Sequence, residues 1–196
     1  LHLCHHNLES IDTKSTTHKL LAEVCMAAKY EGESLKTYRA QYDSKYPGSS
    51  FTMCTMLARS FADIGDIVRG KDLFYGNKQE KEKREGLEKK LKEIFQQIHS
   101  EVTTNGQKSA EAKERYKDTD NYYELREDWW TANRRTVWKA LTCDEDKKLA
   151  GASYFRATCD CGDNRGCSQA KNKCRCSDKP NTDPPTYFDY VPQYLR

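Results

Sequence analysis

The sequence has no long apolar run. No stretch of about 18 consecutive apolar residues occurs, so we expect no segment of these 196 residues to insert into a membrane, and no secretory signal peptide is recognisable. Only 36% of the residues are hydrophobic, 32% are charged, and the mean hydropathy is -0.98. Because the apolar residues nevertheless recur at helical spacing, we predict a helical domain with long solvated helices and not a disordered chain.

Catalytic motifs are missing too. Neither a G-x-S-x-G turn, nor a phosphate-binding loop, nor an H-E-x-x-H zinc motif occurs. Asp63 and Asp66 could form a pair of carboxylates. However, Arg59 and Arg69 stand four and three residues away from them, which is the spacing of ion pairs on one helix face. We therefore predict a protein without catalytic activity and without a cofactor.

A broad excess of one charge is also absent. The 33 basic and 30 acidic residues give a net charge of +3, and a general nucleic-acid binder is usually more basic. One loop is locally cationic and could meet a sulfated or sialylated glycan or an acidic protein patch, although a solvated loop with incidental charge fits equally well. The candidate receptor- or glycan-binding residues in it are Arg165, Lys171, Lys173, Arg175 and Lys179.

Cysteine, in contrast, is abundant, with nine residues spread along the chain. This number and spread favour disulfide bonds and an oxidising compartment. The odd count implies one free thiol or a partner outside the sequence. The disulfide candidates are Cys4, Cys25, Cys54, Cys143, Cys159, Cys161, Cys167, Cys174 and Cys176.

Structural zinc is the alternative use of these cysteines. Zinc sites typically take cysteine pairs separated by two to four residues, whereas the densest cluster here contains C-x-C pairs, which chelate one ion less readily. A single zinc ion would also leave the cysteines of the first 150 residues unexplained. The N-terminal group HLCHH (residues 2–6) fits no regular element that would make its ligands converge. We therefore predict disulfides and no metal site.

Residues 51–68 form the clearest helical pattern. Their apolar residues recur at steps of three and four, which places them on one face of a helix. Gly70 ends the pattern as a C-terminal glycine does, and Ser49 or Ser50 could cap its start. The residues on the apolar face are Cys54, Leu57, Ala58, Phe61, Ile64 and Val68.

Further helices are expected on either side. One begins near residues 15–17 and continues to about Tyr42, with Gly32 as a weak point. Residues 77–102 form a long charged helix with a narrow apolar stripe, and we interpret its alternating charges as a solvated surface. A short helix is expected over residues 109–116.

The helix expected over residues 122–141 is the most aromatic. Trp129, Trp130 and Trp138 nearly encircle it, which is typical of a central helix in a bundle. We therefore assign the tryptophans to the core, and a sugar-stacking platform is the alternative. A long cysteine-rich loop follows, and the aromatic residues of segment 186–196 suggest the start of another packed helix.

Four blocks of sequence carry a resemblance to a known family. They are LARSFADIGDIVRGKDLF (57–74), DWWTANRRTVWKAL (128–141), YFRATC (154–159) and PTYFDYVPQYLR (185–196), and the opening LHLCHHNLESI is similar too. They resemble the alpha class of the Duffy-binding-like domain of erythrocyte membrane protein 1, the variant surface antigen of the malaria parasite. The blocks stand in the family's order and cover nearly the whole chain.

The resemblance implies a mainly α adhesion domain, a disulfide-stapled helical bundle with a long cysteine-rich loop. In the family such a domain has three subdomains. Residues 1–50 would be the end of the first, residues 51–196 most of the second, helical one, and the third would be absent, so we expect the chain to be a fragment. The resemblance also implies that Cys54 is tied to a cysteine in the loop before PQYLR.

The function implied by the resemblance is adhesion. Family members lie on the outer face of a membrane-anchored protein at the infected erythrocyte surface, and the anchor would lie outside this fragment. They bind host-cell surface receptors in cytoadherence and rosetting, and heparan sulfate, a blood-group sugar or a complement receptor are the partners implied, together with host antibodies. The alternatives are a non-binding structural scaffold that presents variable loops and, less favoured, an intracellular zinc-binding module.

Overall fold

The computed structural model describes residues 17–45, 52–73, 76–104, 108–143, 145, 147, 149–150, 152–154, 156–159, 167–170, 173–176 and 184–196. This part of the chain is mainly α-helical, which confirms the predicted fold class. The elements are α2 (Thr17–Lys45), α3 (Met53–Arg69), α4 (Lys78–Thr104), α5 (Ser109–Arg115), α6 (Tyr123–Leu141), β1 (Ala157–Cys159), β2 (Ser168–Gln169), η1 (Phe188–Tyr190) and η2 (Gln193–Leu195). Within these ranges, no helix combines the length and apolar character needed to cross a bilayer.

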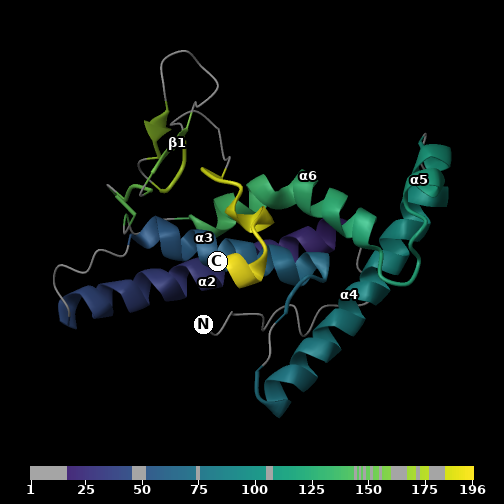
Figure 1. Cartoon of the computed structure of the whole chain (residues 1–196), viewed down its shortest axis with the longest axis horizontal. Helices are drawn as coiled ribbons and strands as arrows, with labels where there is room; N and C mark the ends of the chain where they lie inside the picture. The colour runs from purple at the N-terminus through teal and green to yellow at the C-terminus, as the bar shows by residue number, and fades with distance from the viewer. Residues whose placement is uncertain are drawn as a thin grey trace.

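Three helices form the body of the fold. The helices α2, α3 and α6 pack on one another, and α3 runs in the opposite direction to the other two (Figure 1). The helix α4 crosses them at the end where α3 stops and α6 begins, with α5 beside it. The antiparallel pair β1 and β2 lies over the opposite end, where α3 begins and α6 stops.

The helix α3 has the predicted C-terminus and a different N-terminus. Gly70 adopts a left-handed conformation (φ 72°), and the amide of Lys71 donates to the carbonyl of Asp66 at 2.8 Å, which closes the helix as a C-terminal glycine motif does. The N-cap residue is Thr52, so the helix begins after the predicted caps Ser49 and Ser50, which lie outside the described residues.

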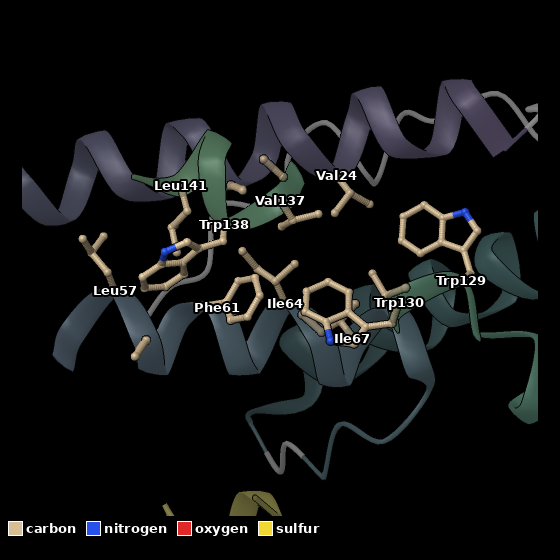
Figure 2. Close-up of a cluster of buried hydrophobic side chains, with 14 of the residues drawn as sticks. Val24, Leu57, Phe61, Ile64, Ile67, Trp129, Trp130, Val137, Trp138 and Leu141 are labelled. Carbon is tan, nitrogen blue, oxygen red and sulfur yellow. The ribbon is translucent and has the colours of Figure 1, made fainter. Parts of the chain in front are cut away.

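The core lies between α2, α3 and α6 and is aromatic at its centre (Figure 2). Trp129, Trp130 and Trp138 are at most 5% exposed, which confirms their assignment to the core and rules out the alternative of a sugar-stacking platform. The ring of Phe61 from α3 lies 5.1 Å from both Trp130 and Trp138 of α6. Such aromatic contacts add to the stabilisation that burial of the rings already provides.

Gly32 is a close contact between helices and not a weak point. The helix α2 continues through it without interruption. A Cβ atom at this position would lie 2.1 Å from the carbonyl oxygen of Leu141, so only glycine lets α2 approach the end of α6. In α4, by contrast, a Cβ at Gly86 would meet nothing within 4 Å.

We predict opposite effects for alanine at these two glycines. Gly86→Ala should raise the free energy of unfolding by about 0.5–1 kcal/mol, because alanine favours a helix and nothing obstructs its methyl group. Gly32→Ala should lower it by about 2–3 kcal/mol, since a backbone carbonyl must move to accommodate the methyl group. Urea unfolding of both variants measures the difference, and a destabilising Gly86→Ala would contradict the prediction.

The C-terminal segment, residues 184–196, does not form the expected helix. It makes the two short 3-10 turns η1 and η2, separated by Val191 and Pro192. Proline cannot donate the amide hydrogen bond that a continuing helix needs, and it disfavours the helical conformation at the preceding residue. Val191 is accordingly extended (φ -73°, ψ 129°).

Candidate functional site

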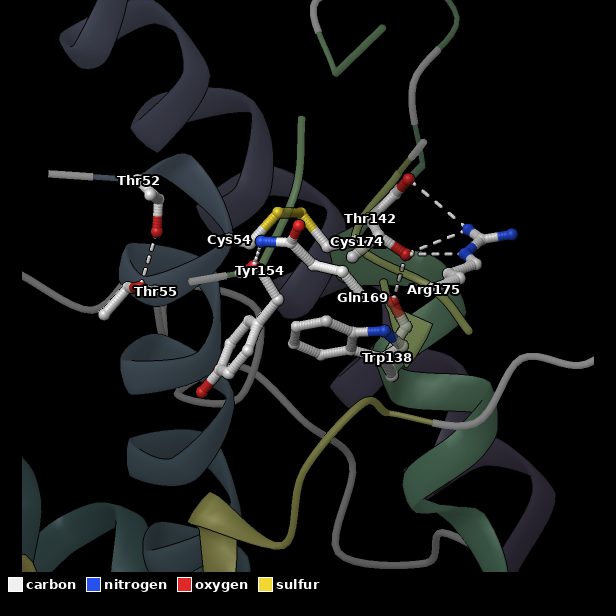
Figure 3. Close-up of a disulfide and its surroundings, with 9 residues drawn as sticks. All are labelled: Thr52, Cys54, Thr55, Trp138, Thr142, Tyr154, Gln169, Cys174 and Arg175. Carbon is white, nitrogen blue, oxygen red and sulfur yellow. Dashed lines mark hydrogen bonds between the residues drawn. A yellow bond between two sulfur atoms is a disulfide. The ribbon is translucent and has the colours of Figure 1, made fainter. Parts of the chain in front are cut away.

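A disulfide fixes the cysteine-rich loop to the helical core. Cys54, in the first turn of α3, is bonded to Cys174, and the two cysteines are 120 residues apart in the sequence (Figure 3). This bond confirms the pairing of Cys54 that the family resemblance implied. A second disulfide joins Cys159, at the end of β1, to Cys176. The two cysteines of the Cys174-x-Cys176 pair thus bond to different partners.

Not all of the remaining cysteines form disulfides. Cys167 is disulfide-bonded, whereas Cys4 and Cys161 lie outside the described residues. Cys25 and Cys143 are free thiols, so the prediction of disulfides for these two is wrong within the part of the chain that the structure describes. Cys25 is half-buried in α2, and this burial raises the pKa of its thiol to about 11, which keeps it protonated and unreactive at neutral pH.

The cationic loop is only partly available for binding. Lys173 is exposed, whereas the guanidinium of Arg175 donates to the hydroxyl of Thr142 at 2.9 Å (Figure 3). It also donates to the carbonyl of Lys139 at 3.2 Å. Arg175 therefore satisfies free carbonyls at the end of α6, and its role in binding stays a prediction. The other three candidates, Arg165, Lys171 and Lys179, lie outside the described residues.

The hydrogen bond of Arg175 to Lys139 places the end of α6 beside the cationic loop. Because the guanidinium of Arg175 reaches the carbonyl of Lys139, the exposed residue Lys139 lies beside the loop although it is far from Arg175 in the sequence. One turn earlier on α6, Arg135 is exposed as well. The sequence alone did not place Lys139 beside the loop, because no local pattern connects α6 to the loop.

A buried carboxylate anchors the C-terminal segment. Asp189, in η1, is fully buried and accepts two hydrogen bonds from Arg134, at 2.9 and 2.6 Å. The indole of Trp130 donates to the same carboxylate at 2.8 Å. Arg69, from α3, donates to the backbone carbonyl of Asp189. The segment is thus held against both α3 and α6, and sequence reading missed this role of Asp189 within an aromatic run.

Asp63 and Asp66 both form ion pairs with Arg196. Asp66 pairs with Arg69 at 2.9 Å, as predicted, and also with Arg196. Asp63 pairs with Arg196 at 3.1 Å and not with Arg59, which points to solvent, so that prediction is wrong. Burial raises the pKa of Asp63 to about 6, and the positive charge of Arg196 opposes this shift.

Large apolar side chains are exposed along the C-terminal segment. Their exposed fractions are 75% for Tyr187, 40% for Tyr190, 76% for Tyr194 and 65% for Leu195. The loop after α3 adjoins them, since the amide of Leu73 donates to the side chain of Gln193 at 2.8 Å. The segment therefore presents exposed apolar side chains next to the loop after α3.

Comparison with known proteins gives one family. The family model of the Duffy binding domain matches residues 1–196. No curated protein sequence matches the chain. Among solved structures, the chain is similar to the PfEMP1 IT4var13 DBLbeta domain bound to ICAM-1, with 28% identity and a TM-score of 0.63 over 99% of this chain and 40% of that one.

Two further solved structures are similar. The ICAM-1-binding PfEMP1 IT4var13 DBLbeta domain has 29% identity and a TM-score of 0.63 over 100% of this chain and 39% of that one. A PfEMP1 DBLb domain bound to human ICAM-1 has 29% identity and a TM-score of 0.56 over 76% of this chain and 33% of that one. The chain spans about two fifths of the length of the first two structures.

Proposed function

Because the chain belongs to the Duffy binding domain family, we propose that it serves as part of an extracellular adhesin that binds a host-cell surface receptor in cytoadherence and rosetting. The observation that carries the proposal is the similarity over 99% of this chain to a PfEMP1 domain bound to ICAM-1. We also propose that the chain is of the alpha class, which the sequence blocks indicated. The similar solved structures are named DBLbeta and DBLb domains. Heparan sulfate, a blood-group sugar or a complement receptor remain predicted partners beside a protein receptor.

The mechanism we propose is presentation of loops by a rigid frame. The buried ion pair of Arg134 with Asp189 and the disulfide of Cys54 with Cys174 hold the loop and the C-terminal segment against the helices. A loop that is ordered before binding loses less conformational entropy when a receptor binds. No step in this mechanism needs a catalytic group, so we extend the proposal to a domain without enzymatic activity.

The location and division of the domain are also part of the proposal. We place it on the outer face of a membrane-anchored protein at the infected erythrocyte surface, and its disulfides suit an oxidising environment. We assign residues 1–50 to the end of the first subdomain and residues 51–196 to most of the second, helical one. The two subdomains share one core across this boundary, since α2 from the first packs on both α3 and α6 from the second.

Receptor binding is tested by passing this chain and a complete domain over immobilised ICAM-1 and over heparin at increasing salt concentration. We expect binding to at least one surface, and heparin binding should weaken steeply with salt because screening shortens electrostatic attraction. Both proteins are also tested on red cells with and without heparinase treatment. If neither protein binds ICAM-1, heparin or red cells, the non-binding scaffold replaces this proposal.

The cationic loop is tested with a charge-reversal pair. Lys171→Glu with Lys173→Glu should weaken heparin binding about tenfold, because electrostatic complementarity is lost. Arg175 is left unchanged, since its replacement would also disturb the end of α6. The matched control is Lys89→Glu with Lys113→Glu, which reverses two exposed charges on α4 and α5. Equal losses in both double variants would show a general charge effect and would exclude this loop as the site.

A further inference from the structure

A pocket of about 250 Å³ opens between the end of α3, the middle of α4 and the first turn of α6. Its apolar lining comes from Ile67, Leu87 and Leu91, which are at most 5% exposed. Lys92 and Tyr123 also line the pocket and carry polar groups. A concave site of this size, with an apolar lining and a few polar groups, suits a small ligand with one aromatic ring system, such as a benzene ring or an indole.

The carboxylates of the pocket are already neutralised. Glu88 receives two hydrogen bonds from Arg126, at 2.7 and 2.8 Å. Asp72 forms an ion pair with Arg84 at 2.9 Å and accepts a hydrogen bond from Gln193 at 3.2 Å. Because these acids have partners within the protein, the pocket offers no strong site for a cationic ligand.

The ammonium of Lys92, in contrast, has donors to spare. It has three N–H donors and uses one on the side-chain oxygen of Asn121, at 2.7 Å. The nearby carboxylate of Asp118 accepts from three backbone amides, including that of Tyr123, so its charge is already well compensated. The hydroxyl of Tyr123 adds a second polar group, on a side chain that is 43% exposed.

We propose that this pocket binds a small aromatic carboxylate, with its ring on Ile67, Leu87 and Leu91 and its carboxylate on Lys92. A carboxylate accepts charge-assisted hydrogen bonds from an ammonium, and these are stronger than neutral ones. The site lies at the end of the bundle away from the cationic loop, so it is separate from the receptor function proposed above.

The test compares two ligands with the same ring and opposite charge. Indole-3-acetate should shift the NMR signals of Leu91 and Tyr123 with a Kd of about 1 mM, the affinity expected for a ligand of about a dozen non-hydrogen atoms. Tryptamine should bind at least about fivefold more weakly, because Lys92 repels its ammonium. Equal binding of the two ligands, or no shift with either, would overturn the proposal.

Variants of Lys92 test whether its charge causes the preference for indole-3-acetate over tryptamine. Lys92→Gln should weaken indole-3-acetate at least about fivefold and remove the preference over tryptamine, whereas Lys92→Arg should retain both because it keeps a cationic donor. The control Lys89→Gln removes an exposed lysine on the same helix and should change nothing. Thermal melts of each variant separate loss of binding from loss of fold. Unchanged binding in a folded Lys92→Gln variant would exclude this role.

Discussion

Replacing Asp189 by alanine should lower the free energy of unfolding by about 3–5 kcal/mol. The substitution leaves the guanidinium of Arg134, which is 9% exposed, without its buried counter-ion, and removal of one partner of a buried pair costs more than the pair itself contributes. It also removes the acceptor for the buried indole of Trp130. Urea unfolding at constant m-value measures the loss.

Two controls define what Asp189 does. Asp128→Ala breaks an ion pair with Arg115 that faces solvent, and it should cost less than about 1 kcal/mol. Asp189→Asn keeps an acceptor for Trp130 and removes only the charge, so it should fall between the two. Amide hydrogen exchange over residues 184–196 shows whether the C-terminal segment detaches first. An Asp189→Ala variant within 1 kcal/mol of the parent would contradict the prediction.

Removal of the disulfide between Cys54 and Cys174 should have a comparable effect. The chain-entropy model gives about 4–5 kcal/mol for a bond that closes a loop of 120 residues, because the unfolded chain without the bond gains that freedom. The double variant Cys54→Ser with Cys174→Ser, unfolded in guanidinium chloride, tests this. It should also reduce receptor binding if the cysteine-rich loop carries the contact.

The second disulfide is the matched control. Cys159 and Cys176 are only 17 residues apart, so replacing both by serine should cost about 3 kcal/mol in the same model. We predict that removal of the disulfide between Cys54 and Cys174 lowers the free energy of unfolding more than removal of the disulfide between Cys159 and Cys176 does. A larger loss from the shorter loop would show that native contacts of Cys159 and Cys176, and not chain entropy, dominate.

Periodicity in the sequence predicted the helices well because helix formation depends on neighbours three and four residues away. The apolar residues of α3 and the three tryptophans of α6 are buried where that spacing places them. The boundaries were less accurate: α3 begins at Met53, and the segment after residue 186 makes only 3-10 turns, because Pro192 interrupts it.

Ion pairs show the limit of local reasoning. The spacing of Asp66 and Arg69 predicted their pairing correctly, but the same argument failed for Asp63, whose partner Arg196 is 133 residues away. Spacing on a helix face makes an i,i+4 ion pair possible but does not ensure it. A carboxylate that is partly buried beside another arginine pairs with that arginine instead. Gly32 was misread for the same reason, since the contact that requires it comes from Leu141 on another helix.

By itself, the sequence determined the mainly α fold, the aromatic core and the family, and the family resemblance in turn implied the pairing of Cys54 with the loop. These properties are written in local periodicity and in blocks of consecutive residues. Only the tertiary structure decided that Asp189 anchors the C-terminal segment, that Arg175 holds the end of α6 and that Lys92 lines a pocket. The reason is physical: each of these roles depends on a partner on another element, and burial changes what a charged side chain can do.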